Sequence, residues 1–227
     1  MMDLYFASYE GSDAGIFNAD LNKKDKALII YHGETLVGFT TLKSYDASWG
    51  IRKIRVVYSG DTVVRKDHWG QQELARAWLE EIGHIKAARM DRPLYWFLLV
   101  KGHRTYKFLT AFARTFYPNQ ARDRNDLKPL ADILANDMFG DNYCPDTGVV
   151  RFNGSRGHLA PGIAWPTAAE LTRSDTRFFL SANPGYLNGE ELVCVCELEL
   201  FNMKPLAQRI VSRSMAGCTG EANLLCA

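Results

Sequence analysis

A strand, a basic turn and a helix that follow one another directly constrain the fold of this chain more than any other feature. Residues 54–64 are rich in β-branched side chains, residues 65–72 form a basic turn that contains glycine, and apolar residues then recur at helical spacing. We predict a helix from about Trp69 to Ala88. The near-continuous apolar run Leu94–Val100 predicts a buried strand. Two strands joined through a helix form a βαβ crossover and run parallel.

The residues before this crossover predict an antiparallel meander. Two apolar runs, residues 27–32 and 35–42, flank a turn in which Gly33 can adopt a positive φ. Residues 44–50 are interpreted as a second connection, and residues 51–64 as the third strand. Three sequential strands with short links are typical of a meander, so the whole sheet is expected to be mixed and the fold class α/β (α+β).

Gly60 interrupts the third strand and predicts a β-bulge or a close backbone approach.

The remaining segments predict one continuous domain, residues 1–227, with a core at 27–117, a C-terminal elaboration at 118–215 and a tail at 216–227. Within it we expect a strand at Leu4–Tyr9, a helix that carries Tyr106 and Phe116 and ends at Pro118, a helix at 126–138, a loop-rich segment at 139–176 with a strand at Val149–Phe152, a short helix at Arg177–Ala182, a strand at Leu192–Phe201, and a helix at 203–215 capped by Asn202. The loop-rich segment could form a substrate lid.

The composition excludes several classes of protein. The 27 basic and 26 acidic side chains nearly balance, which argues against a general nucleic-acid binder. No apolar run approaches the roughly 20 residues that cross a bilayer, so no membrane span is expected. The first residues, Met1–Phe6, lack the basic region and apolar core of a signal peptide, and a cytoplasmic protein is expected.

The five cysteines predict thiols rather than a metal site or a disulfide framework. Cys194 and Cys196 are spaced as same-face neighbours in a strand, whereas Cys144, Cys218 and Cys226 are scattered. No pair of C-x-x-C units exists, so no metal is expected. The odd count disfavours a disulfide framework, and core or unpaired thiols are the simplest interpretation.

The basic turn at residues 65–72 predicts a site for a phosphate-bearing carrier. A turn that opens into a helix aims free backbone N–H groups and the positive end of the helix dipole at one point, where phosphate binds. The predicted donor-binding residues are Arg65, Lys66, Trp69, Gly70, Gln71 and Gln72. The alternatives are an ordinary strand-to-helix turn and solvated edge charges.

The order of these elements resembles the GNAT superfamily of N-acyltransferases. In that family the turn carries an Arg/Gln-x-x-Gly-x-Gly/Ala pattern that holds the pyrophosphate of coenzyme A. The matching segment here is residues 65–74, in which only Gly70 is a glycine. Residues 95–109, and residues 179–186 leading into 190–194, look similar to a bacterial branch with N-acyl amino acid synthases and fatty-acyl transferases of peptide natural-product pathways.

The resemblance implies a GNAT-like mixed sheet with splayed parallel strands and helices on both faces. It also implies acyl-CoA or an acyl-phosphopantetheine carrier as co-substrate, with no covalently bound cofactor. The reduced glycine pattern favours acyl carrier protein, because its pantetheine arm presents one phosphate. The acceptor would be an amine of an amino acid or peptide, and neither nucleic acid nor a membrane span is involved.

Three residues are the candidate catalytic groups. By resemblance, Tyr106 would protonate the leaving thiolate, although it shares an apolar stripe and suits a core role equally well. Asp61 and His32 are candidates for the base that deprotonates the acceptor amine, with His68 and His103 as weaker candidates; a structural role remains open for each. A strand N–H near residues 61–63 would stabilise the oxyanion.

Five aromatic side chains line either an acyl tunnel or the core. They are Trp78, Trp96, Phe108, Phe112 and Phe116. The leading hypothesis is transfer of a medium or long fatty acyl group by direct attack in a ternary complex. The alternatives are a coenzyme A-dependent acetyltransferase that acts on small amines and a non-catalytic acyl-binding module.

Overall fold

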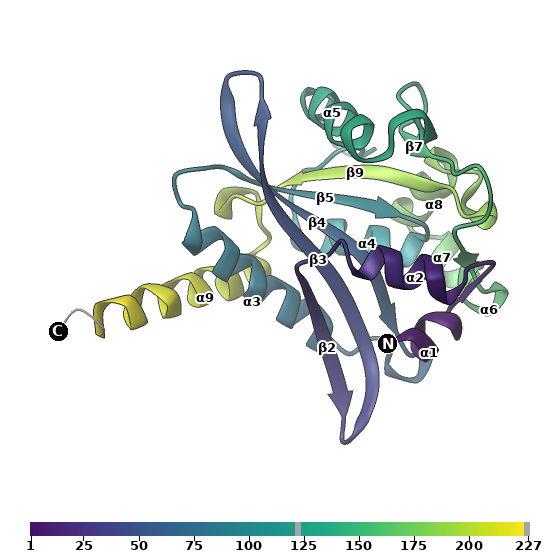
Figure 1. Cartoon of the computed structure of the whole chain (residues 1–227), viewed down its shortest axis with the longest axis horizontal. Coiled ribbons are helices and arrows are strands. Elements are labelled where there is room, and N and C mark those ends of the chain that lie inside the picture. The colour runs from purple at the N-terminus through teal and green to yellow at the C-terminus, as the bar shows by residue number, and fades with distance from the viewer. Residues whose placement is uncertain (121–123, 225–227) are drawn as a thin grey trace.

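The computed structural model describes residues 1–120 and 124–224, with side chains up to residue 217. A seven-stranded sheet in the order β2-β3-β4-β5-β9-β7-β6 forms its centre (Figure 1). The strands are β2 (Lys26–His32), β3 (Thr35–Trp49), β4 (Arg52–Val64), β5 (Leu94–Val100), β6 (Tyr143–Cys144), β7 (Val149–Val150) and β9 (Glu191–Glu197). β4 and β5 are parallel, and the other neighbouring strands are antiparallel. The α/β class and the predicted meander followed by a βαβ crossover are confirmed.

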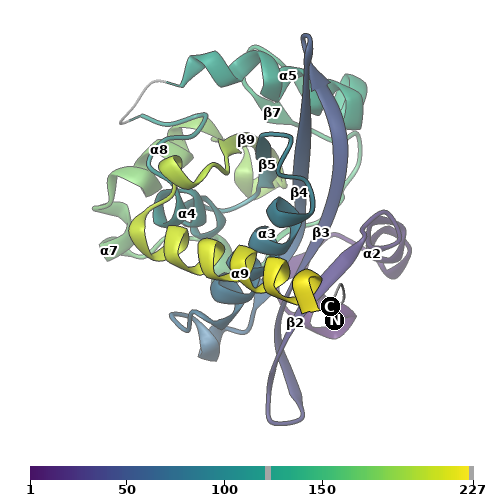
Figure 2. The same ribbon diagram turned by 90° about the vertical axis from the view of Figure 1, so that its left-hand side faces the viewer.

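Helices cover both faces of the sheet. One face packs against α3 (Glu73–Ala88), α4 (His103–Phe112), α8 (Ser174–Ala182) and α9 (Pro205–Leu224), and the other packs against α5 (Lys128–Phe139). Val57 and Trp96 belong to the first core, whereas Val56 and Phe97 belong to the second, as alternation along buried strands requires. Figure 2 shows α9 running alongside α3 on the outside of the sheet.

A third apolar cluster lies at the N-terminus. Here α1 (Met2–Phe6) and α2 (Ala14–Leu21) pack against Phe39 of β3 and Val63 of β4. Residues Tyr9–Glu10, which form β1, pair with β8 (His158–Leu159) in a separate two-stranded sheet. The predicted strand at Leu4–Tyr9 is therefore wrong, because Leu4 and Tyr5 are buried on one side of a helix rather than in a strand.

The meander is longer than its sequence indicated. Gly33 adopts φ +60° in the β2–β3 turn, as predicted. The second connection predicted at residues 44–50 is wrong, since β3 continues to Trp49 and the chain turns at Gly50, with φ +59°. Alternate side chains of this extension, Tyr45 and Trp49 among them, pack against the core beneath α5, which keeps the chain extended despite its polar residues.

The elements after the crossover begin and end differently from their predictions. The helix expected to include Phe116 ends at Phe112, because Ala113 already pairs with Met203 in a β-bridge. The strand expected to reach Phe201 ends at Glu197, and Leu200–Asn202 form a 3-10 turn. The loop-rich segment contains β6, β7, β8 and two one-turn helices, α6 (Pro161–Ala164) and α7 (Ala168–Leu171).

Asn202 is not the cap of the last helix. Its side-chain amide is buried, donates to the carbonyl oxygens of Thr115 and Glu197 at 2.8 Å each, and accepts from the Thr115 backbone N–H. α9 begins at Pro205 and continues to Leu224, past the predicted end at residue 215. Residues 225–227 of the predicted tail lie outside the described residues.

None of the helices in the described part of the chain combines the length and the apolar character needed to cross a membrane. Within the same residues, no three His, Cys, Asp or Glu side chains come together in a group that could hold a metal ion. Cys194 and Cys196 are buried on the same face of β9, in the core with α3 and α4.

Candidate active site

The parallel strands β4 and β5 separate near their carboxyl ends. Their pairing begins at Arg55 and ends at the pair Ser59↔Leu98. Beyond it, within the described residues, β4 pairs with β3 alone and β5 with β9 alone. Main-chain groups of β4 after Ser59 therefore face an opening rather than a neighbouring strand. This is the splayed pair that the resemblance implied.

A β-bulge in β4 lies at this opening. The register between β3 and β4 shifts so that Gly60 and Asp61 lie opposite the single residue Thr41. A Cβ on Gly60 would lie 2.5 Å from Lys24 Cε and 2.5 Å from Thr41 Oγ1, so a larger residue does not fit. The predicted bulge is confirmed, and the close neighbours are side chains. Because a bulge changes which way the following side chain points, it sets the direction of Asp61.

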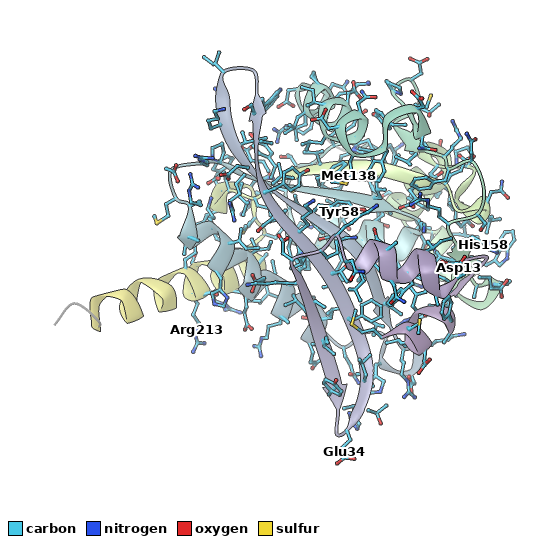
Figure 3. All side chains as sticks on the ribbon, in the orientation of Figure 1. Asp13, Glu34, Tyr58, Met138, His158 and Arg213 are labelled. Atoms are coloured by element: carbon cyan, nitrogen blue, oxygen red, sulfur yellow. The ribbon has the colours of Figure 1, made fainter. Side chains whose placement is uncertain are left out.

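Two cavities meet at the opening from opposite faces of the sheet. The larger, about 280 Å³, lies between α5 and the N-terminal helices, and the smaller, about 30 Å³, lies beneath α3 and α4. Both are lined by Ser59, Gly60, Thr62, Leu99 and Thr105. Tyr58 on the sheet and Met138 on α5, both labelled in Figure 3, mark two sides of the larger cavity. Molecules that enter from the two faces can therefore meet at one point.

Asp61 is the candidate base that lines the larger cavity. Burial raises the pKa of its carboxyl group to about 6, with nearby Asp20 and Glu191 acting in the same direction and Lys101 and Lys24 opposing them. A carboxylate with a pKa near the working pH is well matched to proton transfer. At neutral pH Asp61 is mainly ionised and can accept a proton from an amine.

Ion pairs surround Asp61. Lys101 Nζ lies 3.4 Å from Glu191 Oε1 and 5.4 Å from the centre of the Tyr9 ring. Lys24 pairs with Asp20. Burial by itself lowers the pKa of Lys101, but the carboxylates of Glu191 and Asp61 raise it above its ordinary value, so Lys101 stays charged. These charges hold an ionised Asp61 in a partly desolvated site.

Three further cations line the same cavity without a carboxylate partner among the described residues. They are Lys23, Lys43 and Arg156, the last stacked 4.7 Å from the Phe152 ring centre. The cavity thus combines the candidate base with positive charge that no carboxylate of the described residues pairs with.

Aromatic rings in the wall of the smaller cavity surround the hydroxyl group of Ser59. Trp78 Nε1 and Trp96 Nε1 donate to Ser59 Oγ at 3.2 Å and 2.9 Å. Phe108 and Phe112 complete the wall. Four of the five aromatic residues expected to line an acyl tunnel therefore line this cavity, while Phe116 is buried in the core.

The basic turn after β4 is held by its own side chains. Arg65 forms two hydrogen bonds with Asp67, 3.1 Å and 2.7 Å long. Trp69 Nε1 donates to the Val64 carbonyl oxygen at 2.9 Å, and Lys66 Nζ lies 6.0 Å from the Trp69 ring centre. Both predicted donor-binding cations, Arg65 and Lys66, thus lie at this turn. Arg65 is already engaged in an ion pair with Asp67.

The helix after the turn starts later than predicted. Gly70 is exposed with φ +89°, and α3 begins at Glu73 rather than Trp69. Gln71 donates its backbone N–H to the His68 carbonyl oxygen at 3.4 Å, and Gln72 stands as the N-cap. The N–H groups of an α-helix that lack an intrahelical partner are those of its first turn, which here begins at Glu73. Gly70, Gln71 and Gln72 form the approach to that turn.

Tyr106 lies in the core, away from both cavities. Its side chain is 1% exposed, and its hydroxyl donates to the Pro118 carbonyl oxygen at 2.8 Å. Burial raises the pKa of this phenol. The position does not support the expected role of Tyr106 as the acid.

The histidine candidates also lie away from the cavities. His32 ends β2 and is exposed, with its ring 5.2 Å from that of His68. His103 is buried at the start of α4, where its Nε2 lies 3.3 Å from Glu170 Oε1. Of the candidate bases from the sequence, Asp61 is therefore the one that lines either of these two cavities.

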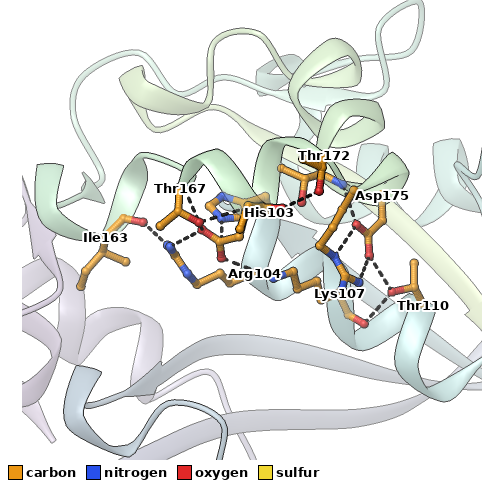
Figure 4. A network of polar contacts seen from close by, with 12 residues as sticks. His103, Arg104, Lys107, Thr110, Ile163, Thr167, Thr172 and Asp175 are labelled. Atoms are coloured by element: carbon orange, nitrogen blue, oxygen red, sulfur yellow. Dashed lines mark hydrogen bonds and ion pairs between the residues drawn. The ribbon is translucent and has the colours of Figure 1, made fainter.

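A network around Glu170 fixes the start of α4 (Figure 4). Glu170 Oε2 accepts from Arg104 at 2.9 Å and from the backbone N–H of Thr167 at 2.9 Å, and Lys107 Nζ lies 3.3 Å from Glu170 Oε1. The Arg104 guanidinium also lies 4.5 Å from the Trp69 ring centre. Through α4, the network thereby links the predicted lid segment, residues 139–176, to the basic turn at residues 65–72, which is the predicted donor turn.

Three residues that line the larger cavity were not predicted from the sequence: Ser59, Lys101 and Glu191. Glu191 begins β9. This strand pairs with β5 although the two strands lie far apart in the sequence. Lys101 follows the buried strand β5 directly, which is a usable signal, because side chains at the carboxyl ends of parallel strands commonly line sites.

Comparisons with known proteins gave no family model and no curated protein that matches this chain. Among solved structures, a probable N-acyltransferase from Enterococcus faecalis is 13% identical, with a TM-score of 0.35, over 45% of this chain and 25% of that chain. A mutant AtaT toxin bound to the C-terminus of the antitoxin AtaR and to acetyl-CoA is 15% identical, with a TM-score of 0.29, over 35% and 52%.

The KacTA–DNA complex is a further similar structure, 16% identical with a TM-score of 0.32, over 47% of this chain and 76% of that chain. The match spans a quarter of the first of these proteins and about half of the second. Similarity at this level of identity and TM-score does not establish an activity, a substrate or a partner for this chain.

Proposed function

We propose that this protein is an N-acyltransferase that moves an acyl group from a phosphopantetheine thioester to an amine of an amino acid or a peptide. The observation that carries the proposal is the meeting of two cavities at the break between β4 and β5, with Asp61 on one side of it. A thioester arm that enters beneath α3 and an amine that enters beneath α5 would meet there. Holding both reactants in one complex supplies much of the rate enhancement of such a transfer.

The donor arm would enter by the smaller cavity. Its wall includes Leu74 and Ala75 of the first turn of α3, so phosphate at that helix start would continue into an arm in the cavity. Arg104 and Lys66 supply positive charge beside the turn. Coenzyme A or acyl carrier protein would present this arm.

The volume of the smaller cavity favours a short acyl group. About 30 Å³ holds two or three water molecules at about 10–15 Å³ each. A coenzyme A-dependent acetyltransferase is therefore the second candidate function. The pantetheine arm itself requires this cavity to widen, and a medium or long acyl chain further requires the aromatic wall around Trp78 and Phe112 to move.

The acceptor is proposed to carry an anionic group beside its amine. Asp61 would hold the ammonium end before deprotonation, and the unpaired Lys23, Lys43 and Arg156 would attract a carboxylate. Such a cavity disfavours polyamines, because they bring only positive charge. An amino acid, or a peptide with a nearby carboxylate, satisfies both ends.

The proposed reaction is direct attack without an acyl-enzyme. Asp61 takes the proton from the ammonium, the free amine attacks the thioester carbonyl carbon, and a main-chain N–H near residues 61–63 would stabilise the developing oxyanion. The buried thiols Cys194 and Cys196 line neither cavity, and burial raises the pKa of Cys196 to about 12. Mass spectrometry of the protein incubated with donor alone should detect no acyl adduct.

The test is a matched panel of donors and acceptors. Acetyl-CoA, a fatty acyl-CoA and a fatty acyl carrier protein are each incubated with phenylalanine or phenylethylamine, which present the same amine with and without a carboxylate. Transfer to phenylalanine from at least one donor supports the proposal, and the preferred donor separates the two candidate functions. Donor binding without transfer to either amine contradicts the proposal and favours a non-catalytic acyl-binding module.

A further inference from the structure

Ser59 Oγ accepts two hydrogen bonds of fixed direction. Trp78 reaches it from α3 at 3.2 Å, and Trp96 reaches it from β5 at 2.9 Å. An indole nitrogen can only donate, and a hydroxyl oxygen has two acceptor lone pairs and one proton. Both lone pairs of Ser59 are thus occupied, so toward any third group Ser59 acts as a donor.

The Ser59 proton has no acceptor among the described residues. The residue is 6% exposed, and a buried donor without a partner costs about 1–3 kcal/mol. Ser59 is also the last residue of β4 that pairs with β5, and it lines both cavities. The unpaired O–H group therefore lies where the two cavities meet.

We propose that Ser59 donates a hydrogen bond to the thioester sulfur and stabilises the leaving thiolate, an inference that rests on the proposed N-acyltransferase function. Asp61 lines only the larger of the two cavities, whereas Ser59 packs with the two indoles on the α3 side. Because the donor arm would enter from the α3 side, the sulfur that it carries would lie on that side, next to Ser59, when an amine from the Asp61 side attacks the carbonyl carbon. A main-chain N–H near residues 61–63 remains for the carbonyl oxygen.

The step balances as a simple acyl transfer. The amine nitrogen forms a bond to the carbonyl carbon, and the carbon–sulfur bond breaks with its electron pair left on sulfur. Asp61 takes one proton from the ammonium before the attack, and the second proton that the nitrogen loses on becoming an amide goes to solvent water. Ser59 keeps its proton and shares it with the thiolate, which takes a proton from water after it leaves the site.

Other hydroxyl groups near the opening are less suited to this role. Thr62 Oγ1 lies 2.7 Å from Thr40 Oγ1, so each is a hydrogen-bond partner of the other. Thr105 lines both cavities, but no pair of donors fixes its rotamer in the way that the two indoles fix Ser59. Preorganised donors stabilise developing charge better than donors that must reorient.

The test separates the hydroxyl from the packing around it. Ser59→Ala leaves the two indole N–H groups without an acceptor, but this effect on packing is the same whichever donor is bound. The comparison is therefore made between the unchanged protein and Ser59→Ala. Each receives two acyl-pantetheine donors that differ only in the leaving atom, sulfur or selenium, because a selenolate leaves with less assistance.

We expect the single-turnover rate with the thioester to fall about 10–100-fold from the unchanged protein to Ser59→Ala, the range for a hydrogen bond to a charged atom. The rate with the selenoester should change by less than about threefold. An equal fall with both donors, or no fall with either, overturns the assignment to the sulfur. Ser59→Cys in the otherwise unchanged chain, with its weaker S–H donor, should give an intermediate thioester rate. Absence of transfer by the unchanged protein from either donor would instead contradict the proposed function.

Discussion

The Arg104 guanidinium lies 4.5 Å from the centre of the Trp69 ring, and this contact joins α4 to the turn between β4 and α3. Trp69 is itself anchored to Val64 by a 2.9 Å hydrogen bond, and Arg104 is anchored to Glu170. The turn is therefore held both by β4 and by the helix that follows β5. A cation over an indole contributes about 0.5–2 kcal/mol, more where water is excluded.

Arg104 provides a test of donor binding. Arg104→Gln removes a cation beside the donor turn, so we expect the KM for the phosphopantetheine donor to rise about 5–10-fold, corresponding to about 1–1.4 kcal/mol. The KM for the acceptor should stay unchanged. Arg213→Gln, on the exposed side of α9, is the matched control. A change in the acceptor KM in place of the donor KM would be incompatible with this assignment.

The unpaired cations of the larger cavity provide a test of acceptor choice. Lys43→Gln and Arg156→Gln should each raise the KM for phenylalanine several-fold, since each loses about 1 kcal/mol of attraction to the carboxylate. The KM for phenylethylamine should not rise. Lys53→Gln, an exposed lysine that bonds to Ser48 and lines neither cavity, is the control. Equal effects on both amines would refute the carboxylate contact.

Tyr106 provides a test of which hydroxyl takes part in the chemistry. Tyr106→Phe removes the hydrogen bond to Pro118 and nothing that lines a cavity. Turnover should stay within about twofold, while urea unfolding should reveal a loss of about 0.5–1.5 kcal/mol. A large loss of turnover with unchanged stability would restore Tyr106 as the catalytic acid.

The contact between α3 and α9 depends on one glycine. A Cβ on Gly83 would lie 2.8 Å from the Val211 carbonyl oxygen and 2.6 Å from Ser214 Cβ. Gly83→Ala should therefore destabilise the protein by about 1–3 kcal/mol through overpacking, although alanine is the better helix former. Gly217→Ala, on α9 with open space around it, should be neutral or stabilising by up to about 1 kcal/mol. Thermal unfolding of both variants checks the pair.

The sequence revealed those parts of the site that are local in the chain. The strand pattern with Gly60 inside it led to the bulge and to Asp61, because a glycine that interrupts a β-branched run commonly marks a bulge or a close approach of other atoms to the backbone. The crossover was predicted as well. Helical periodicity distinguishes α3 from the strand β5, and two strands joined through a helix, here β4 and β5, run parallel.

The other parts of the site depend on packing that periodicity does not report. The stripe containing Tyr106 indicated a buried helix face but not whether that face meets a cavity or the Pro118 carbonyl group. Glu191 comes beside Lys101 only because β9 inserts next to β5, a long-range pairing that no local pattern encodes. The polar extension of β3 past Ser44 looked like a connection because its contacts beneath α5 come from residues far along the chain.

Asp61 links stability to function through its pKa. The folded-state pKa of about 6 lies above the ordinary value of 3.8, so folding favours the protonated form. The contribution of Asp61 to stability is therefore fully present below about pH 4 and is lost as the pH rises through about 6. At pH 7 the buried carboxylate is ionised at a cost in stability. Asp61→Asn removes this cost, and we expect the variant to be more stable at pH 7 by about 1–3 kcal/mol.

The role of Asp61 as the base is tested by the pH dependence of acyl transfer in the unchanged protein and in Asp61→Asn. Single-turnover rates at saturating donor and acceptor should rise with pH through a transition near the Asp61 pKa of about 6 and then level off. Asp61→Asn, although folded and more stable, should be about 10²–10⁴-fold slower at pH 7 and should lack that transition. A variant that retains both the rate and the transition would contradict the assignment of Asp61 as the base at the junction of the two cavities.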